Sequence, residues 1–209
     1  MINILIADDH AIVREGLKQI VSSQADMEVT GEAQNAQGVL DLVRARNWDV
    51  VVLDINMPGR NGLEVLKELK QERPKLPVLV LSVHPEEQYG IRVLKAGAAG
   101  YMNKESAPEE LVTAIRKVIR GGKYLTPTLA ERLAFQVADG SETHPHEKLS
   151  DRELQVLCLI ASGKTVSEIA GDLSLSVKTI STYRARILEK MAMKSSAELT
   201  RYALQNHLV

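Results

Sequence analysis

The sequence predicts an α/β domain with a doubly wound, five-stranded parallel sheet, followed by a smaller all-α domain of four helices. Three observations support this fold class. In the first 120 residues, short runs of Val, Ile and Leu alternate with amphipathic stretches, which is typical of strands that are buried on both faces. A polar stretch with glycine and proline at residues 139–147 then interrupts the alternation. From Leu149 onward the periodicity is helical only.

The predicted strands are the uninterrupted apolar runs, and the predicted helices lie between them. Strands are expected at residues 2–7, 28–32, 49–54, 77–82 and 97–102. Helices are expected at residues 11–22, 36–46, 61–72, 86–96 and 108–120. Strand–helix units with such short connections indicate an open sheet with helices on both faces. In this architecture, ligands bind at the carboxyl ends of the strands.

Residues 121–148 are predicted to link a first domain, residues 1–120, to a second domain, residues 149–209. Two adjacent glycines end the last helix of the first domain, and a Thr-Pro pair can begin one further short helix. The stretch that follows is polar and has no periodicity. We therefore expect its two histidines, His144 and His146, to be solvated.

The second domain has the pattern of a DNA-binding module. Ser150 is expected to cap its first helix, with Glu153 completing a capping box, and Gly163 is expected to end that helix. A short helix and a long helix follow, joined by residues 172–176. This is the layout of a helix-turn-helix, in which the second helix lies in the major groove of DNA.

Composition places the chain among ordinary globular proteins, since 44% of its residues are hydrophobic and 25% are charged. No apolar run reaches the roughly 20 residues that a membrane-spanning helix needs, and the N-terminus lacks the features of a secretory signal. The single cysteine, Cys158, excludes a disulfide framework and is expected to lie in the core. We therefore expect a cytoplasmic protein that has no membrane partner.

The formal net charge of −1 argues against a nucleic-acid partner only if the charge is spread evenly along the chain. The second domain instead carries eight basic and six acidic groups. Within residues 174–195 the imbalance is larger, with five basic groups and one acidic group. The overall charge therefore conceals a local basic segment at the predicted helix-turn-helix.

The long helix expected at residues 177–191 has an apolar and a polar face. The residues expected to face the core recur at spacings of three and four, and they are Ile180, Tyr183, Ile187 and Met191. The polar face offers hydroxyls and cations for phosphates and base edges. The predicted DNA-binding residues are Lys178, Thr179, Ser181, Thr182, Arg184, Arg186, Lys190 and Lys194.

Carboxylates follow two of the predicted strands. Asp8 and Asp9 end the first strand and Asp54 ends the third. These side chains would repel one another at the edge of the sheet, and a divalent cation relieves that repulsion. Oxygen ligands favour Mg²⁺. Ser82 ends the fourth strand, and Lys104 follows the fifth with a charge suited to a phosphoryl group. The set suits phosphoryl transfer to Asp54.

Together with Tyr101 and the residues Met57, Pro58 and Gly62, this set resembles the receiver domain of two-component response regulators. The resemblance implies a flavodoxin-like receiver fold, with Asp54 as the phosphoacceptor for a cognate histidine kinase or a small phosphodonor. It also implies the protein ligands of Mg²⁺, which are Asp9 and Asp54 directly, Asp8 through water, and the backbone carbonyl of Asn56.

The resemblance further implies a switch around the phosphoryl group. Lys104 would pair with the phosphoryl oxygens, Ser82 would move to hydrogen-bond them, and Tyr101 would swing inward. One position departs from the family pattern, because Glu105 follows the lysine where many members have a proline after a cis peptide bond. A cis bond without proline costs roughly 2.5–4 kcal/mol, so the geometry of this peptide stays open.

Parts of the second domain resemble the LuxR-type helix-turn-helix signature, namely residues 149–157, Gly163, residues 168–173 and residues 176–180. With the receiver, the chain resembles a NarL/FixJ-family response regulator over nearly its whole length. The resemblance implies that phosphorylation controls homodimerisation and the binding of promoter double-stranded DNA, with a dimer contact through residues 196–206. Contact with RNA polymerase is a further expectation.

Two other functions fit parts of the sequence. Asp54 would be the transient nucleophile of a phosphatase or phosphotransferase, but the well-known aspartate-nucleophile phosphatases have an acid–base aspartate two residues later, where this chain has Asn56. Alternatively, the helical module would be an adaptor for protein or RNA, against which the basic helix argues. We expect a regulator and no enzyme, with at most Mg²⁺-dependent self-phosphorylation and slow autodephosphorylation.

Overall fold

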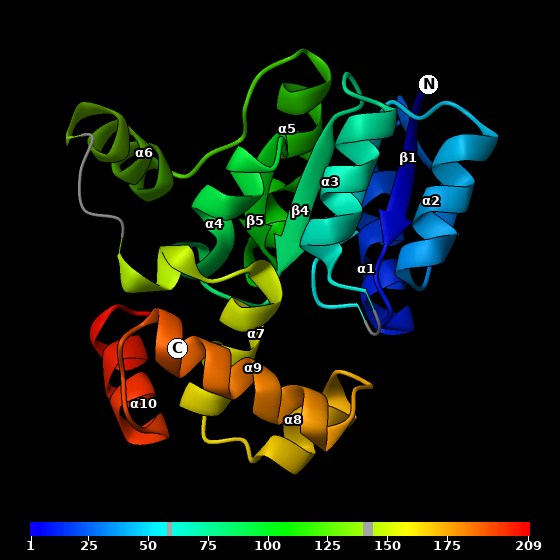
Figure 1. The fold of residues 1–209 in the computed structure, drawn as a ribbon. Coiled ribbons are helices and arrows are strands. Elements are labelled where there is room, and N and C mark those ends of the chain that lie inside the picture. The colour runs from blue at the N-terminus through cyan, green and yellow to red at the C-terminus, as the bar shows by residue number, and fades with distance from the viewer. Residues whose placement is uncertain (58–59, 140–143) are drawn as a thin grey trace. The chain divides into compact units, whose positions relative to one another are not determined.

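The protein is described from a computed structural model (Figure 1), and the structure describes residues 1–57, 60–139 and 144–209. Pro58 and residues 140–143 of the predicted linker therefore lie outside the described residues. The chain divides into two compact units, Met1–Glu131 and Arg132–Val209. We describe each unit by itself. None of the helices in the described ranges has the length and apolar composition that crossing a membrane requires.

The first unit contains the predicted five-stranded parallel sheet, with strand order β2-β1-β3-β4-β5. The strands are β1 (Ile2–Ala7), β2 (Met27–Ala33), β3 (Val50–Asp54), β4 (Val78–Ser82) and β5 (Gly100–Asn103). Every residue of β3 and β4 is buried, as their continuous apolar sequences predict. The doubly wound flavodoxin-like fold expected from the sequence is confirmed.

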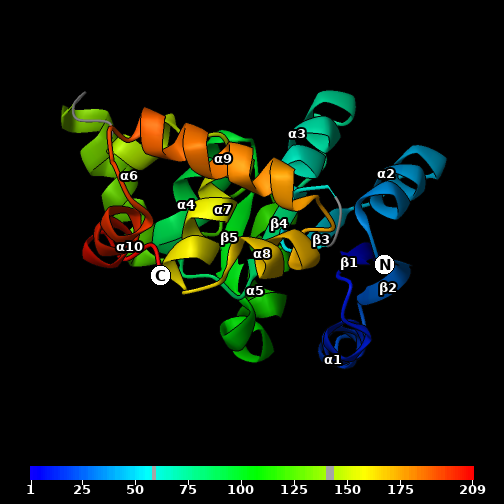
Figure 2. The ribbon, with the colours of Figure 1, turned by 60° about the horizontal axis from the view of Figure 1, so that its bottom comes forward.

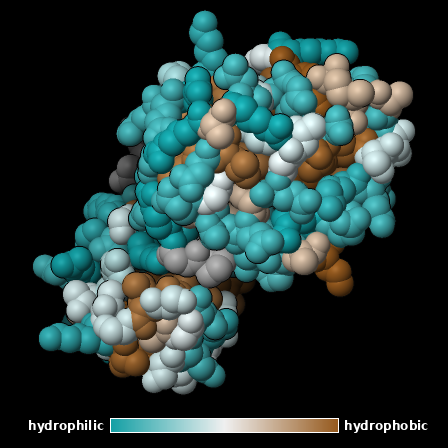
Figure 3. Space-filling view, turned by 90° about the vertical axis from the view of Figure 1, so that its right-hand side faces the viewer, coloured by the Kyte–Doolittle hydropathy of each residue, from teal (hydrophilic) through white to brown (hydrophobic). Residues whose placement is uncertain are grey.

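Helices cover both faces of this sheet. They are α1 (Ala11–Ser22), α2 (Ala36–Ala45), α3 (Gly62–Glu72), α4 (Glu86–Lys95) and α5 (Ala107–Ile119). Figure 2 shows α1 and α5 on one face and α2, α3 and α4 on the other. Leu17 and Val21 of α1 and Leu111 and Ile115 of α5 share one apolar core with the strands. On the side of the molecule that Figure 3 shows, hydrophilic residues surround smaller hydrophobic areas, as is usual for a surface in water.

The fifth strand begins later than the sequence predicts, at Gly100 instead of residue 97. The reason is the end of α4. The N–H of Gly97 donates to Leu94 O at 3.0 Å and that of Ala98 donates to Val93 O at 3.1 Å, which is the bonding of a Schellman turn. Gly97 has a φ of +99°, a conformation that favours glycine. Residues 97–99 therefore close the helix before the chain enters the sheet.

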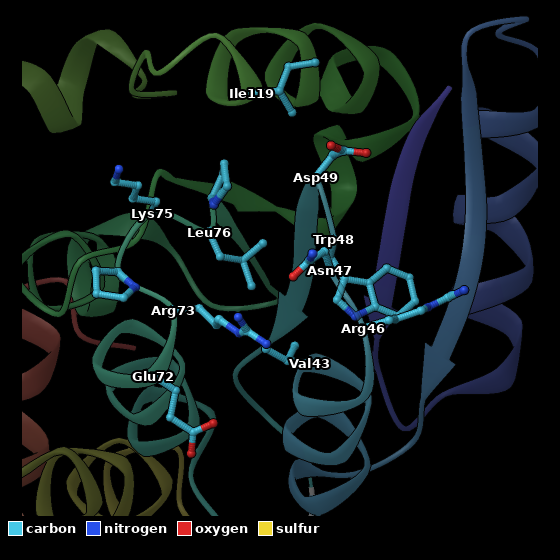
Figure 4. Close-up of a pocket in the computed structure, with 12 residues that line it drawn as sticks. Val43, Arg46, Asn47, Trp48, Asp49, Glu72, Arg73, Lys75, Leu76 and Ile119 are labelled. Carbon is cyan, nitrogen blue, oxygen red and sulfur yellow. The ribbon is translucent and has the colours of Figure 1, made fainter.

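At the amino ends of the strands, away from the carboxyl ends, a hollow of about 590 Å³ lies between the loops that precede β3 and β4 (Figure 4). Trp48 lies in this hollow, with the guanidinium of Arg46 3.8 Å from the centre of its ring. The ring of Trp48 lies against Gly31 of β2. A Cβ atom at Gly31 would be 2.2 Å from that ring.

The segment after α5 lies along β5 and α4. Tyr124 forms a β-bridge with Gly100, and the Thr126 hydroxyl is 2.5 Å from Glu86 Oε2. Helix α6 (Pro127–Asp139) follows and is longer than the short helix that the sequence predicts. Its Leu129 is fully buried, and a Cβ atom at Gly90 of α4 would lie 2.9 Å from the Leu129 side chain. Residues 124–129 of the predicted linker therefore pack against the first unit.

The second unit contains the predicted helices, α7 (Asp151–Ala161), α8 (Val166–Asp172), α9 (Val177–Lys190) and α10 (Ser196–Gln205). Both halves of the capping box between Ser150 and Glu153 are present, which confirms that prediction. The core includes Leu157, Ile180 and Leu199, each 0% exposed, and Cys158 is buried as expected. Tyr183, which the periodicity places in the core, is only half-buried.

The prediction of a solvated histidine is wrong for His146. It lies in the 3-10 turn η2 (Pro145–Lys148) and is only 8% exposed. Its Nδ1 is 2.8 Å from the hydroxyl of Tyr202 in α10, and the ring of His144 stacks on it with centroids 5.3 Å apart. His144 is exposed, as predicted. Burial and a hydrogen bond to α10 therefore attach η2 to the second unit.

Candidate phosphorylation and DNA-binding sites

Acidic side chains meet at the carboxyl ends of β1 and β3. Asp8, Asp9, His10 and Asp54 each offer a ligand atom, and these atoms lie within 4.8 Å of one another. Asp8 and Asp54 are each 1% exposed. The predicted proximity of the three carboxylates is therefore present. Sequence reasoning missed His10, although its position directly after Asp9 was a signal for it.

Local hydrogen bonds hold these carboxylates in place. Asp8 Oδ1 accepts from the N–H of His10 at 2.8 Å, and Asp54 Oδ1 accepts from the N–H of Asn56 at 2.9 Å. Each acceptor lies two residues before its donor, so the turn that follows each strand fixes the orientation of the carboxylate. Asn56 thereby lies beside the cluster, as the sequence predicts.

Lys104 is the cation of the site. Its Nζ lies 2.6 Å from Asp8 Oδ2 and 2.7 Å from Asp54 Oδ2. Burial by itself lowers the pKa of Lys104, but the Asp54 and Asp8 carboxylates outweigh it and raise that pKa above its usual value. Burial raises the pKa of Asp54, and Lys104 and the Asn56 N–H act against that rise. The pocket therefore holds closely spaced acids around one amine.

The donor set fits a hard divalent cation. Asp8 Oδ2, which pairs with Lys104 Nζ, and Asp9 Oδ1, which lies 3.0 Å from His10 Nδ1, are both buried. Buried carboxylate oxygens that lie this close together are suited to a cation that takes oxygen ligands. The cluster can therefore hold a metal ion, with Asp8, Asp9 and Asp54 as the carboxylate ligands.

Ser82 and Tyr101 are connected through the backbone of His84. Ser82 ends β4 and is fully buried, and its Oγ accepts from the N–H of His84 at 3.1 Å. The hydroxyl of Tyr101 donates to His84 O at 2.8 Å, and the tyrosine is 1% exposed, so its ring is already inward. Burial lowers the pKa of the His84 imidazole. The loop after β4 therefore bridges the two predicted switch residues.

The peptide between Lys104 and Glu105 is not cis, because no cis peptide bond occurs in the parts of the chain that the structure describes. Lys104–Ser106 instead forms the 3-10 turn η1. The side chain of Asn103 accepts from the N–H of Glu105 at 2.9 Å. An asparagine cap thus turns the chain here without a proline.

The second candidate site is the outer face of α9. Ser176 caps the helix by accepting from the N–H of Thr179 at 3.0 Å. Ile180, Ile187 and Met191 are buried, which leaves the opposite face to solvent. Six of the eight predicted DNA-binding residues are exposed, and they are Lys178, Ser181, Thr182, Arg186, Lys190 and Lys194.

Two of the predicted DNA-binding cations are engaged within the unit. The Nε of Arg184 donates to Ser196 Oγ at 2.7 Å, and this arginine is half-buried. Lys190 Nζ lies 2.6 Å from Oε2 of Glu153, a residue that is 3% exposed. These contacts connect α9 to α10 and to the start of α7. Arg184 and Lys190 therefore support the fold of the unit.

The predicted hydroxyls are also bonded locally. The side-chain oxygens of Thr179 and Ser176 lie 2.8 Å apart. Ser181 Oγ donates to Val177 O at 2.9 Å and Thr182 Oγ1 donates to Lys178 O at 3.0 Å. Both acceptors are one turn earlier in the same helix, which is an ordinary bond for exposed hydroxyls. Ser181 and Thr182 remain on the surface beside the exposed cations, whereas Thr179 is half-buried.

Comparisons with known proteins identify one known domain family in each part of the chain. Residues 4–116 match the family described as response regulator receiver domain, and residues 147–203 match the family described as bacterial regulatory proteins, luxR family. Over 209 residues the chain is 37% identical to response regulator UvrY of Escherichia coli K12, covering 100% of this chain and 96% of UvrY. Over 210 residues it is 38% identical to response regulator GacA of Pseudomonas aeruginosa, covering 100% of this chain and 98% of GacA.

One solved structure is similar over nearly the whole chain. RcsB from Salmonella enterica serovar Typhimurium, bound to promoter rprA in the presence of the phosphomimetic BeF3−, matches with a TM-score of 0.66 and 27% identity, covering 96% of this chain and 97% of that chain. The receiver match alone covers more than half of this chain. The chain therefore belongs to the NarL/FixJ-family response regulators, which regulate transcription through a receiver domain and a LuxR-type DNA-binding domain.

Proposed function

We propose that Asp54 is the phosphoacceptor, and that its phosphorylation by a cognate histidine kinase controls promoter binding by the second unit. The observation that carries the proposal is the position of Lys104 Nζ, 2.6 and 2.7 Å from the buried carboxylates of Asp8 and Asp54. A phosphoryl group on Asp54 brings anionic oxygens next to this amine. Lys104 is therefore already in position to pair with the negative charge of a phosphoryl group on Asp54.

In the proposed reaction, a carboxylate oxygen of Asp54 forms a bond to phosphorus as the phosphorus–nitrogen bond of the donor histidine breaks. The imidazole leaves with the electron pair of that bond. Mg²⁺, when bound, supplies positive charge for the transferring phosphoryl oxygens. Asp9 and Asp54 would hold it directly, Asp8 through water, and the Asn56 carbonyl would complete the protein ligands.

The proposed switch passes from Ser82 to α4 and to the segment that leaves the receiver. Ser82 moves to hydrogen-bond the phosphoryl group, which disturbs the bond between Ser82 Oγ and His84 N–H and the bond between His84 O and Tyr101. Glu86 of α4 holds Thr126 at 2.5 Å, so a change in this loop reaches the segment before α6. A phosphoryl group adds about −1.5 to −2 charge units to drive the change.

The proposed output is a phosphorylated homodimer that binds promoter double-stranded DNA in the cytoplasm and contacts RNA polymerase. The exposed cations of α9 and of the segment after it support DNA binding. RcsB, which is similar over 96% of this chain, binds promoter DNA in the presence of a phosphomimetic, and two RcsB dimers bind two parallel DNAs. A helix-turn-helix dimer reads two half-sites, and the resemblance to the family implies that the dimer contact runs through residues 196–206.

The phosphoacceptor is tested by intact-protein mass after incubation with Mg²⁺ and acetyl phosphate. The wild-type chain is expected to gain one phosphate that is stable in acid and labile in base, through self-phosphorylation. Asp54→Ala is expected to gain none, and Asp41→Ala, which changes an exposed aspartate on α2, is the matched control and is expected to gain one. Incorporation into Asp54→Ala would show that the site is wrong.

A further inference from the structure

Arg14 is a buried arginine directly behind the acidic cluster. It lies in α1 and is only 7% exposed. Its Nη1 donates to the backbone carbonyl of Asp8 at 2.8 Å, and its Nε donates to Glu32 Oε2 at 3.1 Å. Burying a guanidinium is costly unless its hydrogen bonds are satisfied, so a buried arginine on a backbone carbonyl calls for a structural reason.

Hydrogen bonds from Arg14 and from β2 hold the backbone of the turn that carries the acidic side chains. Asp8 donates its own N–H to Ala33 O of β2 at 3.1 Å, while its carbonyl accepts from Arg14. The backbone N–H of Arg14 also donates to His10 O at 3.2 Å. Both polar backbone groups of Asp8 are therefore fixed, one by β2 and the other by α1.

We propose that Arg14 is a positioning residue for the cation site, which holds the Asp8-Asp9 turn in the orientation that binds Mg²⁺. The inference rests on the proposed function, because it concerns the metal that phosphorylation of Asp54 needs. Fixing a carboxylate before the metal arrives removes the cost of ordering it on binding. Partners that orient metal ligands from behind typically change metal affinity by 10–100-fold when they are removed.

An electrostatic role and a positioning role of Arg14 predict opposite changes in Mg²⁺ affinity when the residue is replaced. A cation near a metal site repels the metal, so a purely electrostatic role predicts tighter Mg²⁺ binding when Arg14 is replaced by a neutral side chain. A positioning role predicts weaker binding, because the Asp8 carbonyl loses its donor and the turn can reorient. The sign of the change therefore distinguishes the two roles.

Lys18 is a matched control within the same helix. Its Nζ pairs with Glu32 Oε1 at 2.9 Å and with Glu15 at 2.7 Å. It therefore shares the carboxylate partner of Arg14, and within the described residues it makes no hydrogen bond or ion pair with Asp8. Replacing Lys18 removes one positive charge from the neighbourhood and leaves the bond from Arg14 to the Asp8 carbonyl in place.

The experiment measures the Mg²⁺ dissociation constant of the full chain by calorimetry, for the wild type, Arg14→Met, Arg14→Lys and Lys18→Met. We expect Arg14→Met to weaken binding about tenfold or more, and Lys18→Met to change it less than about twofold. Arg14→Lys keeps the charge but not the planar fork, and is expected to bind as weakly as Arg14→Met. In acetyl phosphate reactions, the Arg14 variants should need more Mg²⁺ and reach the wild-type extent of phosphorylation at saturation.

Wild-type or tighter Mg²⁺ binding by a folded Arg14→Met would overturn the positioning role. If Arg14→Met does not fold, as judged by circular dichroism, Arg14→Lys decides, and binding at wild-type strength by that variant overturns the role. Equal weakening by Lys18→Met would also overturn it, since the effect would then follow charge. Failure of the wild type itself to bind Mg²⁺ would instead contradict the proposed function, so the two failures are distinguishable.

Discussion

Replacing Lys104 by methionine tests the electrostatics of the phosphorylation site through folding stability. The Nζ of Lys104 lies 2.6 and 2.7 Å from carboxylates whose side chains are 2% and 1% exposed. Removing one partner of a buried ion pair costs about 3–5 kcal/mol, because the remaining charge is buried without compensation. Since the Lys104 side chain is itself 13% exposed, we expect a loss near the lower end, about 3 kcal/mol.

This loss is expected to depend on pH. Burial already raises the pKa of Asp54 in the folded protein, and Lys104 opposes that rise; without the lysine, the pKa rises further. An acid with a raised folded pKa contributes stability below its unfolded pKa and loses it as the pH rises through the folded pKa. The penalty of Lys104→Met should therefore be larger at pH 8 than at pH 5, because acid neutralises the Asp54 carboxylate that has lost its partner.

Urea denaturation at the two pH values, in EDTA, measures the effect on the free energy of unfolding. The fluorescence of Trp48, the single tryptophan of the chain, reports the first unit. Lys75→Met, at an exposed lysine of the same unit, is the control and should stay within about 0.5 kcal/mol of the wild type. A loss from Lys104→Met below about 1 kcal/mol, or an equal loss at both pH values, would refute the reasoning.

Three further predictions concern the DNA-binding face, acid stability and packing. Arg186→Glu removes an exposed cation of α9 and should weaken binding to any DNA duplex and reduce the salt dependence of log K by about 1–2 units. Fluorescence anisotropy at several salt concentrations measures both effects. Unchanged affinity would show that this face of α9 does not bind DNA. Burial acts to raise the pKa of Glu153, but Lys190 and the Ser150 N–H hold that pKa below its usual value. Glu153 therefore contributes stability above its unfolded pKa, and this stability is lost as the pH falls through the folded pKa. Glu153→Gln should cost about 1–3 kcal/mol at pH 7 and less at pH 3, and a difference independent of pH in denaturation curves would contradict this. Gly62→Ala places a Cβ atom 2.4 Å from Ile55 Cα and should lower stability by about 1–3 kcal/mol; Gly16→Ala, with nothing within 4 Å, is the control and should be neutral or stabilising by up to about 1 kcal/mol. Equal melting temperatures for the two glycine variants would disprove the contact.

The elements that could be predicted from sequence are those whose cause is local. The apolar sequences of β3 and β4 are continuous, so their burial follows from the residues themselves. The capping box of Ser150 and Glu153 depends on residues three apart. The carboxylate cluster was predictable because parallel strands bring their carboxyl ends to one edge.

The features that escaped prediction depend on partners far away in sequence. His146 is buried because Tyr202, 56 residues later, bonds its ring, and no local pattern carries that information. Arg184 has the helical position of a DNA-binding residue, but Ser196 engages its Nε. Arg14 reads as an ordinary charged residue of an amphipathic helix until the carbonyl of Asp8 is placed against it.

The central claim is that phosphorylation of Asp54 controls DNA binding. It is tested most directly by the affinity of the full chain for its promoter DNA, located by genome-wide mapping, with and without Mg²⁺ and acetyl phosphate, for the wild type and Asp54→Ala. We expect the phosphodonor to tighten binding by about fivefold or more in the wild type, and to leave Asp54→Ala unchanged. Equal tightening in both proteins, or none in a wild type whose mass confirms the added phosphate, would contradict the account.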